Sequence, residues 1–589
     1  MTFKANQTVC ACYICRKYKT IDMKSKGLAK VNVWAKAAMM IMVVITACTK
    51  PAQNTTSVHT TATTFTNPDR PKLVVGLVID QMRYDYLYRY WDKYSDNGFK
   101  KLLRKGFNFK NTQYSYVPTY TAPGHASIYT GSEPAINGIV GNNWYERKTG
   151  RVVYCTEDNT VKTVGSTSDA GQQSPANLMT TTITDELRLS TNMGAKVIGV
   201  SLKDRGSILP AGHLANGAYW FDSESGNWIT STFYRNDLPG WVQEFNSKQY
   251  PNQHLSQVWN TLLPIEQYTE STADDMPWEG TLAGESKPVF PHNLPAIRKK
   301  DYELLRSTPG GNTITKDFAL AALKGENLGK GKYTDFLAVS FSTPDYVGHT
   351  FGPNSIEAED IFLRLDREIG EMIAEIEKEV GAGNVLFFLT ADHGAAHVPA
   401  FLTNNKVPAG VSSSSAIRDS VENYLGKIYG KGPWVERYIN QNIYLNRKLI
   451  ENKKLPLGEM QQRVAEYVIR LEPVQRAVTA FTIATNSWAG GMMGRVEKGF
   501  FPSRSGDVVL LLSPAWFEGY GSAPAKGTTH GSYSNYDTHV PLVWYGWNVK
   551  HGESSVETKV ADIAPTIAAW LYIQEPNGSV GTPLQQYMK

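Results

Sequence analysis

The stretch Leu73-Val-Val-Gly-Leu-Val-Ile79-Asp80 is a short apolar run that ends directly in a carboxylate. Seven apolar residues without polar alternation predict a strand buried on both faces, as in a parallel sheet covered by helices. Similar runs occur at 197–202, 336–341, 385–389, 508–512 and 540–545. Helical patterns lie between them, notably at 358–380 and 457–471. The alternation predicts an α/β fold with a doubly wound, mostly parallel sheet.

Charged residues follow several of these strands. Asp80 comes directly after the first run, and Lys203 and Arg205 follow the second. Asp345 lies four residues after the third run, and Asp392 three residues after the fourth. Ligands of open α/β sheets bind beyond the carboxyl ends of the strands. The shared placement therefore predicts one site at that edge of the sheet.

The candidate metal ligands are carboxylates and imidazoles from separate segments: Asp80, Asp345, His349, Asp392, His393 and His530. One helical turn or a tight loop would bring Asp345 and His349 to the same cation. Asp392-His393-Gly stands at a strand end, so its two side chains could serve neighbouring metals. His530 lies in Gly-Thr-Thr-His-Gly-Ser, whose small residues permit close approach. This ligand chemistry suits zinc, and two zinc ions about 4 Å apart would clamp a phosphoryl group.

Each of these residues taken alone is more simply a capping Asp or a hydrogen-bonded His. The argument for metal rests on their number and their placement at strand ends. The other candidate histidines, His125, His397 and His539, are expected to be structural or to lie outside the ligand set.

Thr121 is the candidate nucleophile. It stands in Tyr-Thr-Ala-Pro-Gly-His, just before a helix-compatible run. A hydroxyl at a helix N-terminus faces free amide donors that stabilise a bound phosphate, although an N-cap Thr without chemistry has the same sequence pattern. Asn142 could donate to a phosphoryl oxygen, and Lys203 and Arg205 could supply a point charge and a bidentate fork.

The chain of 589 residues is organised around one predicted catalytic domain at 71–589, with capping insertions at about 206–330 and 400–505. Residues 1–47 resemble a bacterial lipoprotein signal, because a basic segment precedes a short apolar run and the lipobox-like Ile-Thr-Ala-Cys48. Cys48 is the predicted lipidation site, and the Thr-rich segment 48–70 is a predicted tether. The protein is therefore expected to be an exported lipoprotein of the periplasm or outer membrane, held to membrane only through its lipid.

The charge distribution excludes a nucleic-acid partner. Residues 1–47 carry a net charge of +7, which leaves −2 for the rest of a chain whose total is +5. The basic excess belongs to the leader, so the body has no basic footprint for nucleic acid.

Together these segments resemble the alkaline phosphatase superfamily, and within it the PafA-type alkaline phosphatases of bacterial envelopes. The resemblance covers nearly all of residues 72–589. It implies two Zn²⁺ ions and a phosphothreonine formed on Thr121 during hydrolysis of small phosphomonoesters. One ion would be held by Asp345, His349 and His530, and the other by Asp80, Asp392, His393 and the Thr121 oxygen. Asn142, Lys203 and Arg205 would bind the non-bridging phosphoryl oxygens.

Related activities provide the alternatives. Sulfatases of the superfamily need a Cys or Ser in a motif that becomes formylglycine, which Thr121 cannot supply. Phosphodiesterases and nucleotide pyrophosphatases share the metal ligands and the Thr. The pair Lys203 and Arg205 favours a dianionic monoester over a diester. A different class, a non-catalytic metal-binding envelope lipoprotein, is disfavoured by the intact set of ligands and nucleophile.

Overall fold

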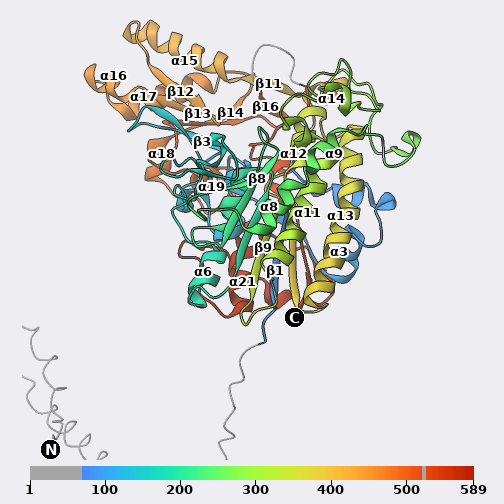
Figure 1. Ribbon diagram of the computed structural model, residues 1–589. Coiled ribbons are helices and arrows are strands. Elements are labelled where there is room, and N and C mark those ends of the chain that lie inside the picture. The colour runs from blue at the N-terminus through green and yellow to red at the C-terminus, as the bar shows by residue number, and fades with distance from the viewer. Residues whose placement is uncertain (1–68, 520–525, 589) are drawn as a thin grey trace, which may run out of the picture. The chain divides into compact units, whose positions relative to one another are not determined.

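The computed structural model of the protein describes residues 69–519 and 526–588 (Figure 1). The predicted leader, the lipidation site Cys48 and the tether up to residue 68 lie outside the described residues. Among the helices of the described part, none is both long and apolar enough to cross a membrane.

The core is an 11-stranded, mostly parallel sheet, which confirms the predicted fold class. Its central strands run parallel in the order β10 (Val385–Thr390), β1 (Leu73–Ile79), β9 (Asp335–Phe341), β6 (Val197–Ser201) and β7 (Gly217–Asp222). Beyond β10 lie β17 (His539–Gly546), β2 (Phe107–Gln113), β18 (Gly552–Ser554) and β19 (Thr558–Lys559). Beyond β7 lie β8 (Asn227–Ser231) and β5 (Thr163–Val164). β17 is antiparallel to both of its neighbours.

Helices cover both faces of the sheet. On one face α7 (Asp204–Ala211) packs on β6, β7 and β9, and α4 (Thr121–Thr130) packs on α7. On the other face α11 (Pro309–Gly325) packs on β9 and β6 and contacts α13 (Ile356–Val380), which contacts α3 (Phe99–Lys105) (Figure 1). The strand residues alternate accordingly. Gly199 meets α7 so closely that a Cβ would lie 2.5 Å from the Ser207 carbonyl oxygen, whereas Leu202, the residue after β6, lies beside Gly311 of α11.

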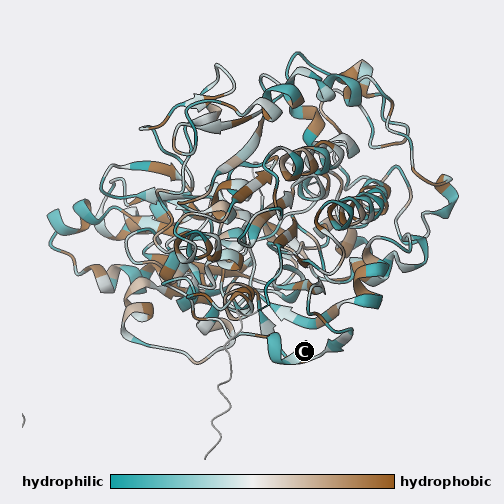
Figure 2. Cartoon of the chain, turned by 60° about the horizontal axis from the view of Figure 1, so that its bottom comes forward, coloured by the Kyte–Doolittle hydropathy of each residue, from teal (hydrophilic) through white to brown (hydrophobic). Residues whose placement is uncertain are grey.

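Burial explains why these segments form these elements. Every residue of β1, β6, β7, β9 and β10 is buried, as expected for strands covered on both faces. Hydropathy along the chain follows the same division, with apolar segments inside and hydrophilic segments on the outer turns (Figure 2). The amphipathic α13 begins at Ile356 and ends at Val380, close to the predicted range 358–380.

One apolar run lies in a different sheet from the one expected. Residues 508–512 form β15 (Val508–Leu512), but it joins β12 (Val435–Ile439), β13 (Asn442–Leu445) and β14 (Val474–Thr479) in a separate four-stranded sheet. The expectation that this run belongs to the parallel core is wrong, because an apolar run reports burial and not the identity of its partner strands. The sheet packs with α15 (Ser414–Tyr429) and α17 (Leu457–Val468) around a cluster of its own that includes Trp434.

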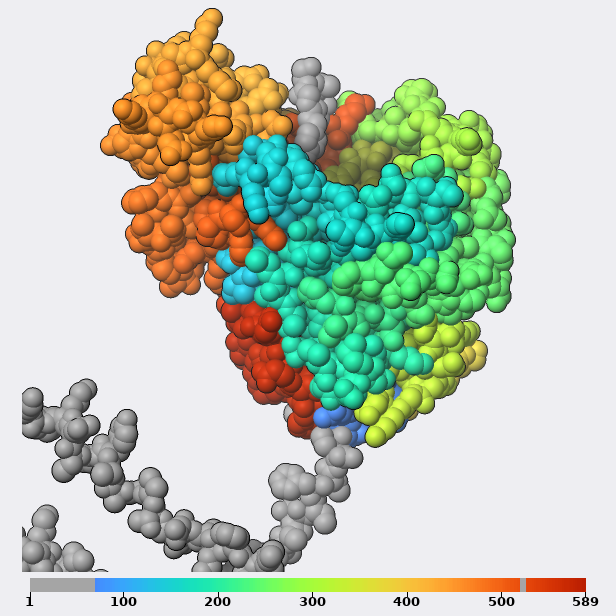
Figure 3. Space-filling view, turned by 60° about the vertical axis from the view of Figure 1, so that its left-hand side comes forward, coloured from blue at the N-terminus to red at the C-terminus, as the bar shows by residue number. Residues whose placement is uncertain are grey.

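These elements form a lobe that protrudes from the core (Figure 3). The lobe falls within the predicted insertion at 400–505, with β15 added from just beyond it. The other predicted insertion, 206–330, contributes β7, β8 and α11 to the core in addition to surface segments such as α8 (Gly240–Ser247).

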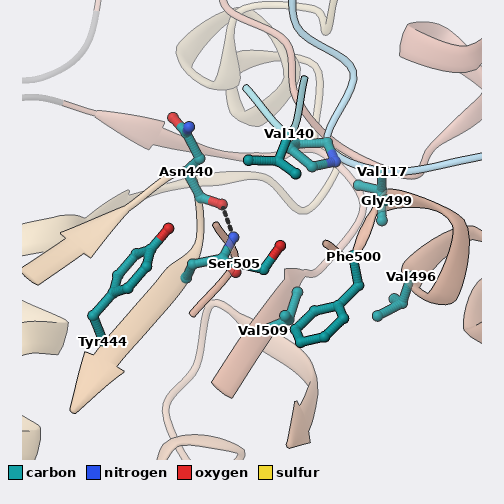
Figure 4. A pocket seen from close by; sticks show the side chains of 11 residues that line it. Val117, Val140, Asn440, Tyr444, Val496, Gly499, Phe500, Ser505 and Val509 are labelled. Carbon is teal, nitrogen blue, oxygen red and sulfur yellow. Dashed lines mark hydrogen bonds between the residues drawn. The ribbon is translucent and has the colours of Figure 1, made fainter. Parts of the chain in front are cut away.

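The lobe meets the core beside the segment that leads to Thr121. A cavity of about 10 Å³, room for roughly one water molecule, is lined by residues that include Val117, Val140, Asn440, Phe500 and Ser505 (Figure 4). Here Val117 donates its N–H to the Arg495 carbonyl oxygen at 3.1 Å. A Cβ at Gly499 would lie 1.7 Å from the Val117 carbonyl oxygen, so this contact requires glycine.

Candidate functional site

The predicted site residues converge at the carboxyl ends of the central strands. Asp80 follows β1, Lys203 follows β6, and Asp392 and His393 follow β10. Asp345 and His349 lie on α12 (Thr343–Phe351), which begins two residues after β9. His530 reaches the same place from a loop. Of the predicted site residues, only Cys48 lies outside the described part of the chain.

The three histidines share one arrangement. Each donates its Nδ1–H to a backbone carbonyl oxygen: His349 to Thr528 at 2.8 Å, His393 to Gly394 at 2.9 Å and His530 to Thr119 at 2.7 Å. A carbonyl oxygen only accepts, so the neutral form of each ring has its proton on Nδ1 and its lone pair on Nε2. These hydrogen bonds fix the tautomer and ring direction that a metal-ligating histidine needs. Burial opposes the charged form of His349, but Asp345 outweighs it and raises the pKa of that ring.

The Nε2 atoms point toward carboxylates. His349 Nε2 lies 3.1 Å from Asp345 Oδ1, and His530 Nε2 lies 3.7 Å from the same oxygen. His393 Nε2 lies 3.5 Å from Asp80 Oδ1 and 3.6 Å from Asp392 Oδ2. Among the described residues, two groups of ligand atoms are close enough to hold an ion: Asp345, His349 and His530, and Asp80, Asp345 and His393. The predicted ligand Asp392 belongs to neither group, although its Oδ2 lies near His393 Nε2.

Burial sets the charge state of these groups. Burial lowers the pKa of His393 to about 3, and burial together with His393 keeps the pKa of His530 well below its usual value. Both rings are therefore neutral and able to ligate. Burial and the neighbouring carboxylates raise the pKa of Asp80 and of Asp392. Burial also opposes ionisation of Asp345, but His349 and Lys203 outweigh it and hold its pKa well below the usual range.

The residues present fit metal ions. The Asp80 and Asp392 side chains are fully buried, and Asp80 Oδ1 and Asp392 Oδ2 have no hydrogen-bond partner among the described residues. A buried charge without a partner is costly, so buried carboxylates are paired, hydrogen-bonded or bound to metal. The Lys203 ammonium contacts Asp80 Oδ2 at 2.6 Å and Asp345 Oδ2 at 2.5 Å, and it is one cation against three carboxylates.

Thr121 lies beside this group. It is the first residue of α4, is 1% exposed, and places its Oγ1 3.5 Å from His393 Nε2. The next backbone amide, Ala122 N–H, donates to Asn142 Oδ1 at 2.9 Å. This bond orients the Asn142 side-chain amide, whose remaining NH₂ group is a donor. The start of α4 therefore brings together a hydroxyl, a donor and the positive end of a helix.

Arg205 belongs to a short hydrogen-bond network. Its Nη1 donates to the Tyr154 hydroxyl at 2.8 Å, and that hydroxyl donates to Asp204 Oδ1 at 2.6 Å. Burial would lower the pKa of Arg205, but Tyr154 and Asp204 outweigh it and raise that pKa well above its usual value. Burial likewise opposes the charge on Lys203, but Asp345 and Asp80 raise its pKa. Both side chains are cations.

Two residues of the site have no counterpart in the sequence prediction. Gln81 adopts a left-handed backbone with φ 65° and donates its N–H to Asp392 Oδ1 at 3.1 Å. Its side-chain amide donates to Asp345 Oδ1 at 2.5 Å. A positive φ at a buried non-glycine residue marks a strained position of the kind found at functional sites. The only sequence signal was its place directly after Asp80. Tyr154 lies in a strand far from any motif and gave no signal.

The three other candidate histidines, His125, His397 and His539, have hydrogen-bond partners outside the two ligand groups. His125 contacts the Thr121 carbonyl oxygen and Ser340, at 2.9 and 2.8 Å. His397 contacts Asn354 at 2.7 Å. His539 stacks on the Tyr84 ring.

The comparisons with known proteins agree with this geometry. The family model of type I phosphodiesterases and nucleotide pyrophosphatases matches residues 74–534. Alkaline phosphatase PafA of Elizabethkingia meningoseptica is 46% identical over 522 residues, which cover 88% of this chain and 94% of that protein. The chain belongs to the alkaline phosphatase superfamily. The resemblance that the sequence motifs indicated is confirmed.

Other relatives cover the same region. Alkaline phosphatase PhoV of Synechococcus elongatus is 46% identical over 88% of this chain and 93% of its own length. A protein of Myroides odoratus named a calcium-transporting ATPase is 49% identical over 88% of this chain and 95% of its own length. The crystal structure of wild-type PafA superposes with a TM-score of 0.86 at 45% identity, covering 88% of this chain and 99% of that one. Membership of this superfamily implies bound metal ions, for which the two Asp/His groups are suited.

Proposed function

We propose that the protein is a zinc-dependent phosphomonoester hydrolase that works through a phosphothreonine on Thr121. The observation that carries the proposal is the arrangement around Thr121. Its hydroxyl lies beside neutral His393 and at the start of α4, within one buried group of carboxylates and imidazoles. Similarity to two alkaline phosphatases over most of the chain supports it.

The ligand sets are those that the family resemblance implies, and the short distances among their atoms support them. Asp345, His349 and His530 would hold one zinc ion, and Asp80, Asp392 and His393 would hold the other, next to the Thr121 oxygen. When bound, zinc would lower the pKa of the Thr121 hydroxyl and neutralise charge on the phosphoryl group. Neutral imidazole and carboxylate ligands favour zinc over harder cations.

The reaction is a double displacement at phosphorus. The Thr121 oxygen forms a bond to phosphorus while the ester oxygen leaves with the electron pair of the broken bond. Water then attacks the phosphothreonine, and inorganic phosphate leaves as the Thr121 hydroxyl is restored. The Asn142 amide, Lys203 and Arg205 would bind the non-bridging oxygens, whose charge needs positioned donors throughout.

A phosphodiesterase is the second candidate, since the matching family model carries that description. Lys203 and Arg205 favour the phosphomonoesterase over the phosphodiesterase. Lys203 is 4% exposed and Arg205 is anchored by Tyr154, so both charges are fixed at the site. A monoester dianion carries one more charged oxygen than a diester and gains more from two fixed cations. The relative named as an ATPase fits the same chemistry, because ATP ends in a phosphoryl group with non-bridging oxygens.

The cellular location proposed is that of an exported bacterial lipoprotein in the periplasm or outer membrane, anchored through Cys48. Changing Cys48 to Ser should remove detergent-phase partitioning and leave the turnover rate unchanged. Unchanged partitioning of the processed variant would contradict the anchor.

The function is tested with the zinc-loaded mature protein and a panel of phosphomonoesters and phosphodiesters. Monoester turnover should dominate, and acid quenching during turnover should trap phosphate on Thr121. The Thr121→Ala variant should retain its zinc but lose turnover by on the order of 10³-fold or more. Covalent phosphate on a different residue, or a diester preference, would overturn the proposal.

A further inference from the structure

Tyr154 and Arg205 are joined by a closed set of hydrogen bonds at the edge of the site. Tyr154 ends β4 (Arg151–Tyr154), which pairs with β3 (Asn143–Glu146) in a hairpin, and Arg205 lies in the first turn of α7. The Tyr154 hydroxyl has one hydrogen, which it gives to Asp204 Oδ1 at 2.6 Å. Its oxygen is therefore free to accept from Arg205 Nη1 at 2.8 Å. Asp204 Oδ1 also accepts the Arg205 backbone N–H, which closes the network.

The anchored nitrogen leaves the opposite edge of the guanidinium open. Nη1 is the terminal nitrogen on the Cδ side, so the edge formed by Nε and Nη2 faces away from Tyr154. Arg205 Nε is buried and has no hydrogen-bond partner among the described residues. A buried donor without a partner is rare and needs an explanation. An oxyanion bound by the Nε–Nη2 edge provides one, since this edge matches two phosphoryl oxygens bidentately.

We propose that Tyr154 is a positioning residue: its hydroxyl holds the Arg205 guanidinium so that the Nε–Nη2 edge faces the phosphoryl group. This inference rests on the proposed phosphatase function. A free arginine side chain has many rotamers, and ordering it during binding costs free energy. Tyr154 and Asp204 order it before substrate arrives. The positive charge itself remains without Tyr154, so the hydroxyl contributes direction rather than charge.

The distinction between direction and charge predicts a specific pattern. Tyr154→Phe keeps the ring and the Arg205 charge but removes the hydrogen bond to Nη1. Hydrolysis of a dianionic monoester should fall by about 10-fold in kcat/KM, the effect of one charge-assisted hydrogen bond. A monoanionic diester has one fewer charged oxygen to bind to the Nε–Nη2 edge of Arg205, so its hydrolysis should fall by about 2-fold or less. The inhibition constant of inorganic phosphate should rise in step with the monoester loss.

The experiment is a double-mutant cycle with Tyr154→Phe, Arg205→Ala and the double variant, measured with p-nitrophenyl phosphate and bis-p-nitrophenyl phosphate. If Tyr154 acts through Arg205, adding Tyr154→Phe to Arg205→Ala should cost nothing further. Tyr145→Phe is the matched control, because Tyr145 belongs to the same hairpin but contacts Tyr444 and Arg437. It should leave both substrates unaffected. Zinc content and melting temperature should be equal in all variants.

Three outcomes would overturn the proposal: additive losses in the cycle, equal losses on both substrates, or wild-type rates for Tyr154→Phe. Each is distinct from failure of the proposed function, which would appear as absence of phosphomonoester turnover in the wild type. In that case calorimetric binding of inorganic phosphate to the same four proteins still tests the role of Tyr154. Equal phosphate affinity in the wild type and Tyr154→Phe would then reject it.

Discussion

Removing the metal from the zinc-loaded protein should lower its melting temperature by about 2–6 °C. The reason lies in the carboxylates of the site. Asp80 and Asp392 are fully buried, and one oxygen of each has no hydrogen-bond partner among the described residues. A bound cation satisfies these oxygens. Without it, the folded state carries their desolvation cost and the unfolded state does not.

The magnitude follows from these two atoms. A buried acceptor left without a partner costs about 1–3 kcal/mol, so two cost about 2–6 kcal/mol. Unfolding entropy near 60 °C is about 2 cal/mol/K per residue, which for roughly 500 ordered residues gives about 1 kcal/mol/K. Each kcal/mol therefore shifts the melting temperature by about 1 °C.

The assay is scanning calorimetry of the loaded protein, of the protein after dialysis against a chelator, and of the chelated protein with zinc restored. Asp80→Asn should shrink the metal-dependent shift, because the amide has no charge to compensate and binds zinc weakly. Asp366→Asn is the matched control. Asp366 is also fully buried, but it accepts backbone N–H bonds from Ser95 and Phe99. Its substitution should therefore lower the melting temperatures of the loaded and the metal-free protein equally. An identical melting temperature with and without metal would refute the reasoning.

Three further predictions concern binding, packing and pH. The double variant Lys203→Ala/Arg205→Ala should lose monoester hydrolysis by about 10²- to 10⁴-fold and diester hydrolysis much less. Equal losses in parallel assays would contradict the proposal that these two cations favour monoesters. Gly499→Ala should displace the Val117 backbone, because a Cβ would lie 1.7 Å from its carbonyl oxygen, and should lower both activity and melting temperature. The control Gly426→Ala, in open space on α15, should change neither. Burial opposes the charge on His292, but its two glutamate partners raise its pKa to about 9. Its stabilisation, on the order of 3 kcal/mol, is fully present below pH about 6.5 and is lost as pH rises through about 9. Denaturant titrations should therefore show that the difference in free energy of unfolding between wild type and His292→Gln falls between those pH values. A difference that does not change with pH would exclude the ion pairs as its cause.

The position of the site along the chain could be predicted because a parallel sheet has a chemically distinct edge. Asp80, Lys203 and Asp392 each follow a buried apolar run. In the structure Lys203 contacts Asp80, and His393 lies beside both Asp80 and Asp392. That inference needs only strand recognition and the rule that parallel strands share a carboxyl edge. The orientation of His349 and His530 was beyond it, since the carbonyl oxygens that hold these rings belong to Thr528 and Thr119, far away in the sequence.

Other features could not be read from local pattern. The run 508–512 has the same apolar character as the core strands, yet it pairs with β13 and β14 in the lobe. Burial is encoded in such a run, but the partner is decided by the loops on either side. Tyr154 illustrates the same limit for function. Its role depends on a hydroxyl meeting a guanidinium 51 residues away in sequence, and neither residue lies in a motif that predicts the contact.

The fold itself contributes to anion binding at this site. Thr121 is the first residue of α4, Arg205 the second of α7 and Asp345 the third of α12. All three helices therefore begin at the carboxyl edge of the sheet and direct their N-terminal dipole ends toward it. These partial charges belong to the backbone and survive side-chain substitution. The affinity for inorganic phosphate that remains in a zinc-loaded Lys203→Ala/Arg205→Ala variant thus measures what the backbone and the metal ions supply without the two side-chain cations. Because the dipole ends are fixed by the strand–helix connections, this part of the binding does not depend on either side-chain cation.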